Sequence, residues 1–123
     1  MTFETSLRAQ VKTAATNVYW TVRPQASPLP AVVLTVVADN REQDLEGFTT
    51  TRFTRVQFDI LASERPQVAT LREAVIAAIA GPFLRDGIQF QRAMFEDVVD
   101  RGTDTDTGFV HRDQFDAVFR HNG

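Results

Sequence analysis

The stretch Ala31-Val32-Val33-Leu34-Thr35-Val36-Val37-Ala38 is the most apolar run in the chain and consists mainly of β-branched residues. It is far shorter than the roughly 20 apolar residues that a membrane-spanning helix needs. β-Branched residues favour extended backbone, and an apolar run without polar alternation is typical of a strand covered on both faces. The sequence therefore predicts a central strand over residues 31–38, and we expect the sheet to be organised around it.

The residues on either side of this strand predict further elements with short connections. Before it, 3–16 have apolar residues at helical spacing, 18–22 have the composition of a strand, and the proline-rich 23–30 predict a stiff connector. After it, the charged residues 39–47 predict an exposed hairpin tip, and 48–62 predict a long strand whose second half alternates apolar and polar residues. One face of the sheet is therefore expected to be wet or to meet a polar surface.

The second half of the chain continues the same pattern. Pro66 predicts the start of a helix over 66–80, which the Gly81-Pro82 pair ends. Alternation predicts a strand over 88–99, and a turn over 102–108 leads into a last strand in which apolar residues share one parity: Phe109, Phe115, Ala117 and Phe119. We therefore expect one α+β domain over residues 1–123, with a mainly antiparallel five-stranded sheet and two helices packed on one face.

Composition limits the function classes. The chain has 123 residues, a mass of 13.8 kDa and no cysteine, which fits one domain without a disulfide framework. A net charge of −3 argues against a general nucleic-acid or anionic-membrane binder. No basic, apolar signal segment precedes the first helix, so we expect a soluble protein made in a cytoplasm. Arginine greatly outnumbers lysine and there are 10 phenylalanines, a bias that interfaces favour, although a GC-rich genome also favours arginine.

No pattern in the chain predicts an enzyme, a metal site or a cofactor. Phosphate-cradling glycine loops and the zinc-protease helix motif are absent from the sequence. The two histidines are His111, which we interpret as a surface or pairing residue, and His121, which lies near the C-terminus where chains commonly fray. Residues 104–108 alternate Asp and Thr before a Gly but lack the glutamate that a calcium loop needs at position twelve, so we interpret them as a turn.

Two surfaces stand out as candidate contact sites. In 47–55, phenylalanines and arginines alternate without the basic surroundings of an RNA-binding sheet, which favours a protein–protein contact, although ordinary core positions for Phe48 and Phe53 remain open. The second surface, 96–106, has a local net charge of −4. It is either a solvated acidic segment or a surface that repels nucleic acid or binds an arginine of a partner.

Four stretches together resemble the tail-completion proteins, or tail terminators, of long-tailed phages and gene transfer agents. They are Ser27–Leu34, Arg55–Ala62, Ala69–Ile79 and Thr107–Phe119. The resemblance lies in the order and spacing of these patterns over nearly the whole chain, because no single motif is diagnostic. The chain departs from the family in its strongly charged Asp/Thr loop and in having only Phe119 where a bulky aromatic usually ends the last strand.

The resemblance implies a structural, non-enzymatic virion protein without a cofactor or a membrane. Such proteins cap the head-proximal end of the tail tube, stop its polymerisation and join it to the head. The implied partners are further copies of the chain in a ring, as a rule a hexamer, the tail tube protein, and a head-closure or connector protein. DNA would pass through the lumen without specific binding. The implied location is the head-proximal end of the tail, after assembly in a bacterial cytoplasm.

Within this resemblance, specific residues become candidates. A closed ring needs two different patches on each subunit, and the predicted tip with the strand after it can supply one of them. We therefore predict that Arg41, Phe48 and Arg52 contribute to subunit or tube contacts. We also predict that carboxylates line or border the lumen, where they would repel DNA phosphates; the candidates are Glu96, Asp97, Asp100, Asp104 and Asp106.

Two other functions stay open. Another neck protein, such as a head-closure, stopper or connector protein, would also be small and ring-forming. A small-ligand-binding or enzymatic α+β domain would instead show a deep apolar cavity with convergent polar groups.

Overall fold

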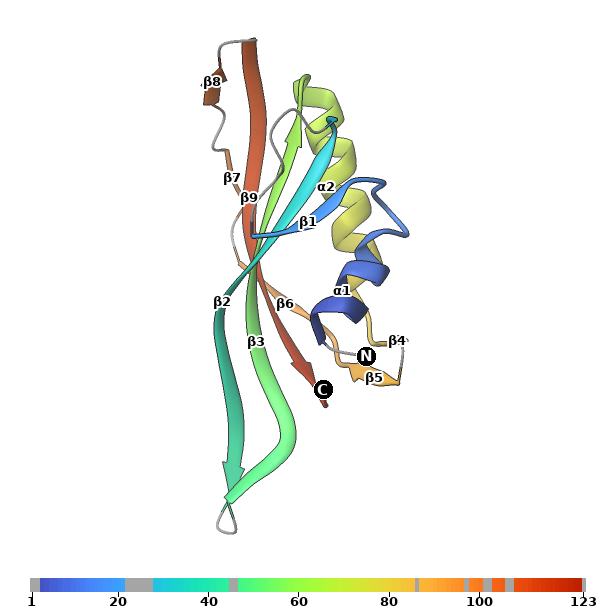
Figure 1. Cartoon of the computed structure of the whole chain (residues 1–123), viewed down its shortest axis with the longest axis vertical. Coiled ribbons are helices and arrows are strands. Elements are labelled where there is room, and N and C mark those ends of the chain that lie inside the picture. The colour runs from blue at the N-terminus through green and yellow to red at the C-terminus, as the bar shows by residue number, and fades with distance from the viewer. Residues whose placement is uncertain are drawn as a thin grey trace.

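A computed structural model describes residues 3–21, 28–44, 47–85, 87–96, 98–100, 103–105 and 108–122, with side chains for all of these except 40–44, 47–51, 103–105 and 108–109. These residues form two helices and nine strands (Figure 1). In chain order the elements are α1 (Phe3–Val11), β1 (Val18–Trp20), β2 (Ala31–Asp44), β3 (Gly47–Ala62), α2 (Arg65–Ala80), β4 (Phe83–Arg85), β5 (Ile88–Phe90), β6 (Met94–Phe95), β7 (Val99–Asp100), β8 (Thr103–Thr105) and β9 (Gly108–His121).

Three long strands carry the sheet. The strand order is β1-β2-β3-β9-β5-β4, and β6, β7 and β8 also pair with β9. β2, β3 and β9 are antiparallel to one another, whereas β1 runs parallel to β2 through the pairs from Val18↔Val32 to Trp20↔Leu34. The far side of β9 is therefore lined in turn by β5, β6, β7 and β8, each over a few residues.

The predicted five-stranded, mainly antiparallel sheet is wrong. The described sheet is mixed and has more strands, because the single strand expected over 88–99 is divided into β5, β6 and β7, which pair with successive parts of β9. The residues 83–85 form the additional strand β4, and part of the expected turn over 102–108 forms β8. The first helix ends at Val11 rather than at residue 16.

The predicted hairpin tip over 39–47 is also corrected. Both strands continue through most of it, with pairs that run out to Gln43↔Phe48 and Asp44↔Gly47. The pairing of β3 with β9 ends at Arg52↔His121, so beyond that point β2 and β3 continue as a two-stranded ribbon. We call this ribbon, residues 41–44 and 47–51, the arm. Figure 1 shows that it projects well beyond both helices.

The core lies between the sheet and the two helices, which cover the same side of the sheet in Figure 1. Even-numbered residues of β3 and odd-numbered residues of β9 face the helices, because successive side chains of a strand point to opposite faces. The rings of Phe58 and Phe115 stack there with centroids 5.0 Å apart. Apolar residues of both helices complete this core, among them Leu7, Val11, Val68, Val75 and Ile79. Much of the phenylalanine in the composition therefore belongs to the core: Phe3, Phe58, Phe90, Phe115 and Phe119.

Candidate assembly interface

The three predicted contact residues lie on the arm or at its base. Arg41 on β2 is the register partner of Arg52 on β3, and Phe48 is the register partner of Gln43. The side chain of Arg52 forms an ion pair with Asp39. The side chains of Arg41 and Phe48 lie outside those that the structure describes. The backbone thus places all three residues on one projecting hairpin, and their role in contacts stays a prediction.

A polar cluster of two buried residues, Thr54 and His121, and the exposed Asp39 anchors the base of the arm to the body of the protein. The hydroxyl of Thr54 lies 3.1 Å from Asp39 Oδ1 and 2.7 Å from His121 Nε2. A hydroxyl has one proton to donate. If Thr54 donates it to Asp39, the Nε2–H of His121 must donate to Thr54, which sets the tautomer of the imidazole. The His121 ring also packs 4.2 Å from the ring of Phe3 on α1, measured between centroids.

His121 is therefore an ordered part of the core, and the expectation of a fraying end is wrong at this residue. Its side chain is buried, and burial, followed by the charge of Arg52, lowers its pKa to about 4. The imidazole is thus neutral at neutral pH. A hydroxyl beside an imidazole resembles catalytic chemistry, but Thr54 and His121 are only 3% and 2% exposed, so both belong to the buried interior. The cluster instead joins β2, β3, β9 and α1.

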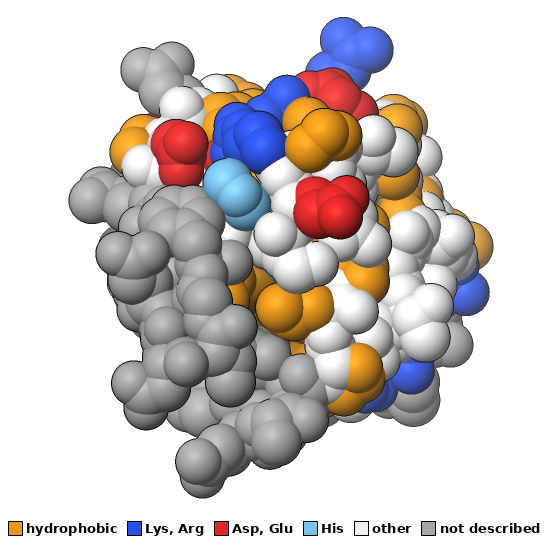
Figure 2. Space-filling model, turned by 90° about the horizontal axis from the view of Figure 1, so that it is seen from above, with side chains coloured by type: hydrophobic (Ala, Val, Ile, Leu, Met, Phe, Trp, Pro, Cys, Tyr) orange, Lys and Arg blue, Asp and Glu red, His pale blue; other side chains and the backbone are white. Residues whose placement is uncertain are grey.

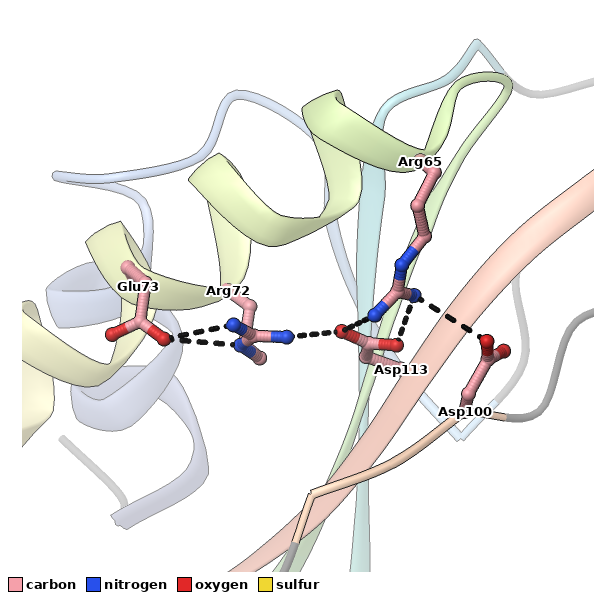
Figure 3. A network of polar contacts seen from close by, with 5 residues as sticks. All are labelled: Arg65, Arg72, Glu73, Asp100 and Asp113. Atoms are coloured by element: carbon pink, nitrogen blue, oxygen red, sulfur yellow. Dashed lines mark hydrogen bonds and ion pairs between the residues drawn. The ribbon is translucent and has the colours of Figure 1, made fainter.

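A second polar cluster, missed by the sequence interpretation, fixes α2 on the sheet. Asp113 on β9 is fully buried and binds two arginines of α2 (Figure 3). Its Oδ2 lies 2.6 Å from Arg72 Nη1 and 3.2 Å from Arg65 Nη2. Hydrogen bonding to Asp113 raises the pKa of both guanidinium groups. Glu73 contacts Arg72 and Asp100 lies 3.8 Å from Arg65, which extends the cluster at both ends. We call Asp113 with Arg65 and Arg72 the clamp.

The sequence held a signal for this clamp. Asp113 shares the odd-numbered parity of Phe115, Ala117 and Phe119, and that parity predicts the buried face of the last strand. A carboxylate at a core position needs charged or hydrogen-bonding partners, because burying an unpaired charge is costly. Arginine partners were therefore to be expected on the element that packs over Asp113.

The opposite face of the sheet carries paired charges. Arg55 on β3 forms ion pairs with Glu96 and, at 3.4 Å, with Asp116 on β9. Arg112 lies 3.6 Å from Asp59, which also accepts a hydrogen bond from the amide of Gln114. The predicted polar face of β3 is thus present, and its described arginine is already matched by carboxylates.

The predicted acidic residues do not gather on one described surface. Glu96 pairs with Arg55 on the polar face, whereas Asp100 lies beside Arg65 on the helix side of the sheet. Asp104 lies in β8, but its side chain is not among those described, and Asp97 and Asp106 lie outside the described residues. At the end of the molecule seen in Figure 2, basic, acidic and hydrophobic side chains adjoin one another. The lumen-facing role of the acidic set stays a prediction.

Exposed hydrophobic side chains lie along the edges of the sheet. Within the described part of the chain, every large exposed one belongs to an edge segment: Val36, Val37, Leu84, Met94, Phe95, Val98 and Val99. β1 pairs with β2 as far as Leu34, and from residue 35 onward β2 has no neighbour on that side among the described residues. At the other side of the sheet, β6 and β7 pair with β9 alone among the described strands. The strand predicted to be central is therefore half uncovered.

Other kinds of site find little support in the described residues. Among them, no three His, Cys, Asp or Glu side chains come together in a way that could hold a metal ion. No helix in the described ranges is both long and apolar enough to cross a membrane. A surface hollow of about 420 Å³ near α2 has no charged side chain in its lining, which consists of Ala14, Pro30, Pro66, Gln67, Thr70, Leu71 and Ala74.

Comparison with known proteins gives a likeness of fold. One solved structure, a chain from the "Virion of native gene transfer agent (GTA) particle", superposes with a TM-score of 0.64 and 14% sequence identity. The match covers 98% of this chain and 95% of that chain. A second solved structure matches with a TM-score of 0.56 and 16% identity over 98% of this chain and 91% of that one. No protein-family profile and no curated protein matches the sequence.

Proposed function

We propose that this chain is a structural virion protein that caps the head-proximal end of a phage or gene transfer agent tail tube. In this role it ends tube polymerisation and, as a homo-oligomeric ring, forms the surface that joins tail to head. The observation that carries the proposal is the likeness of fold, end to end, to a chain of a gene transfer agent virion. The order of sequence patterns that resembles tail terminators gives independent support.

The projecting arm suits such a role. A two-stranded ribbon without further cover is only marginally stable in water, so it gains most when it lies against another protein. Hydrogen bonds among Asp39, Thr54 and His121 join the base of the arm to the core and fix the direction in which the arm projects. We propose that the arm, with Arg41, Phe48 and Arg52, contacts a neighbouring subunit or the last ring of the tube.

The polar face of the sheet suits a channel through which DNA slides. A guanidinium that is already paired with carboxylates attracts phosphate less than a free one, and this applies to Arg55. We propose that DNA passes the ring without specific binding. Replacing Glu96 and Asp116 with Gln and Asn should then increase retention of duplex DNA by the assembled protein at low salt, measured by filter binding. Unchanged retention would contradict this assignment of the polar face.

Tube assembly in vitro tests the capping role. Tail tube protein that polymerises in the presence of the chain should give shorter tubes with one closed end, seen by negative-stain microscopy. The triple variant Arg41→Ala/Phe48→Ala/Arg52→Ala should lose capping, whereas Leu84→Ala, an exposed change on β4, should retain it. Full capping by the triple variant would exclude the arm from the contact. Binding to tail-free heads instead of tubes would favour a head-closure protein.

A further inference from the structure

Two of the sheet's edges, as far as the structure describes them, differ in sequence but both expose apolar side chains. One edge is β2 from Thr35 onward, with Val36 37% exposed and Val37 52% exposed. The other consists of residues 94–96 and 98–100, which contain β6 and β7, with Met94 62% exposed and Val99 41% exposed. A free strand edge offers unpaired backbone groups to another chain, and proteins usually block such edges with charged residues, lysine above all, or with proline. The apolar stretches 35–38, 94–95 and 98–99 contain neither, and the charged residues of both edges lie outside these stretches.

The apolar run of β2 supports a missing neighbour. Residues 31–38 have the composition of a strand whose two faces are covered, and Ala31, Val32, Val33 and Leu34 are indeed buried, whereas Val36 and Val37 are exposed. The second half of the same run has no paired neighbour beyond the end of β1 in the part of the chain that the structure describes. The exposed valines in this apolar run are explained if the apolar edge of another copy packs against this half of β2 in the assembled protein.

The strand directions allow the two edges to join. β2, β3, β9 and then β6 with β7 alternate in direction across the sheet, because each of these neighbours is antiparallel. The segment 94–100 of one copy therefore runs opposite to β2 of a second copy when both sheets present the same face. The resulting ladder is antiparallel and continues the pattern of the monomer. The contact joins two different surfaces, so it repeats from copy to copy and closes into a ring when the rotation fits.

We propose that copies of this chain associate head to tail through these edges, with β2 from residue 35 onward against the segment 94–100 of the next copy. This inference rests on the proposed ring and identifies the surfaces that build it. The valines of β2 lie against the apolar side chains of the second edge, where burial of both removes the exposed hydrophobic surface of the monomer. The occupant of each edge is another copy of the same chain.

Disulfide trapping tests the contact, because the chain has no cysteine of its own. The double variants Val37→Cys/Val99→Cys and Val37→Cys/Met94→Cys sample the two ends of the second edge. Under mild oxidation, at least one should give a ladder of linked oligomers on a non-reducing gel. The single variants should give none, because like residues do not meet in a head-to-tail contact. A control double variant, Val37→Cys/Leu84→Cys, pairs β2 with exposed β4 and should also give none.

Charge-blocking variants give a second, independent readout. Val37→Lys and Val99→Lys should each be monomeric in analytical ultracentrifugation, and their equimolar mixture should form dimers but nothing larger, since one intact edge remains on each. Circular dichroism checks that both variants fold, as expected for substitutions at exposed positions. Dimers from a single cysteine variant, or no ladder from either double variant at any concentration tested, would overturn the proposal. If Val37→Lys still caps tubes, the edge contact is excluded while the proposed capping function remains. If the double variants form disulfide-linked ladders but the chain has no effect on tube length, the edge contact remains and the capping function is excluded.

Discussion

Asp113 and Asp116 lie on the same strand, on opposite faces of the sheet, and both pair with arginine. Asp113 is fully buried and holds Arg65 and Arg72 of α2, whereas Asp116 keeps a quarter of its side chain exposed, at 26%, and shares Arg55 with Glu96. The same chemical pair therefore has two different roles. On the helix side, the charge pair is part of the core and its loss is costly. On the polar side, solvent competes with it, and the pairs mainly set the charge of the surface.

The largest effect is expected from removing both arginines of the clamp. Arg65→Ala/Arg72→Ala leaves the Asp113 carboxylate buried without a charged partner, so the free energy of unfolding should fall by about 3–5 kcal/mol. Urea denaturation monitored by circular dichroism measures this loss. A loss below about 1 kcal/mol would show that water reaches Asp113 and that the clamp is not a buried ion pair.

Removing the carboxylate of the clamp, instead of its arginines, tests which partner is the buried one. Asp113→Asn leaves arginines whose side chains are 41% and 19% exposed, so both can reach water, and the amide keeps a hydrogen bond. The expected loss is about 1–2 kcal/mol, clearly smaller than for the double arginine variant. Equal losses for the two variants would contradict the view that Asp113 is the buried end of the clamp.

The buried histidine predicts a pH dependence with a defined sign. His121 has a lowered pKa of about 4 in the folded protein, against about 6.5 in an unfolded chain. The unfolded state therefore binds the proton more readily, and the contribution of the neutral imidazole is complete above about pH 6.5 and is lost as the pH falls toward 4. The loss should be on the order of 3 kcal/mol, since one pKa unit corresponds to about 1.4 kcal/mol.

Carboxylates also titrate in this range, so the comparison with His121→Gln isolates the imidazole. Urea denaturation of both proteins between pH 4 and pH 7 should give a shallower pH dependence for the variant. Parallel curves would mean that His121 does not titrate differently in the folded and unfolded states.

The smallest effect is expected on the polar face. Arg55→Ala removes an exposed cation from Glu96 and Asp116, which water then solvates. The free energy of unfolding should not change measurably in the same urea experiment. A loss as large as that of Asp113→Asn would remove the distinction between the two faces.

Alternation in the sequence predicts the faces of the long strands well. The parity of Val56, Phe58 and Ile60 and that of Phe115 and Phe119 correspond to the buried side in the structure. The order of the helices and the long strands was likewise accessible, because their patterns extend over many residues. The same parity placed Asp113 at a core position. It did not identify the arginine partners, because these depend on how α2 packs over β9.

The short strands and the arm were not predictable in the same way. β6 and β7 have two residues each and are separate strands because they pair with successive parts of β9; the local alternation predicted one continuous strand and does not mark the breaks. In residues 39–44 the charged side chains have low strand propensity, and the ladder with β3 keeps this segment extended. Arg41 was therefore expected in a hairpin tip and lies instead on a strand ribbon, whereas Phe48 lies on a strand as its sequence predicted.

Electron microscopy of particles assembled with and without this chain tests the central claim most directly. If the chain ends the tail tube, particles assembled without it should carry overlong tubes that fail to join filled heads, and supplying the chain should restore one uniform tube length. Tubes of normal length joined to heads in the absence of the chain would contradict the account.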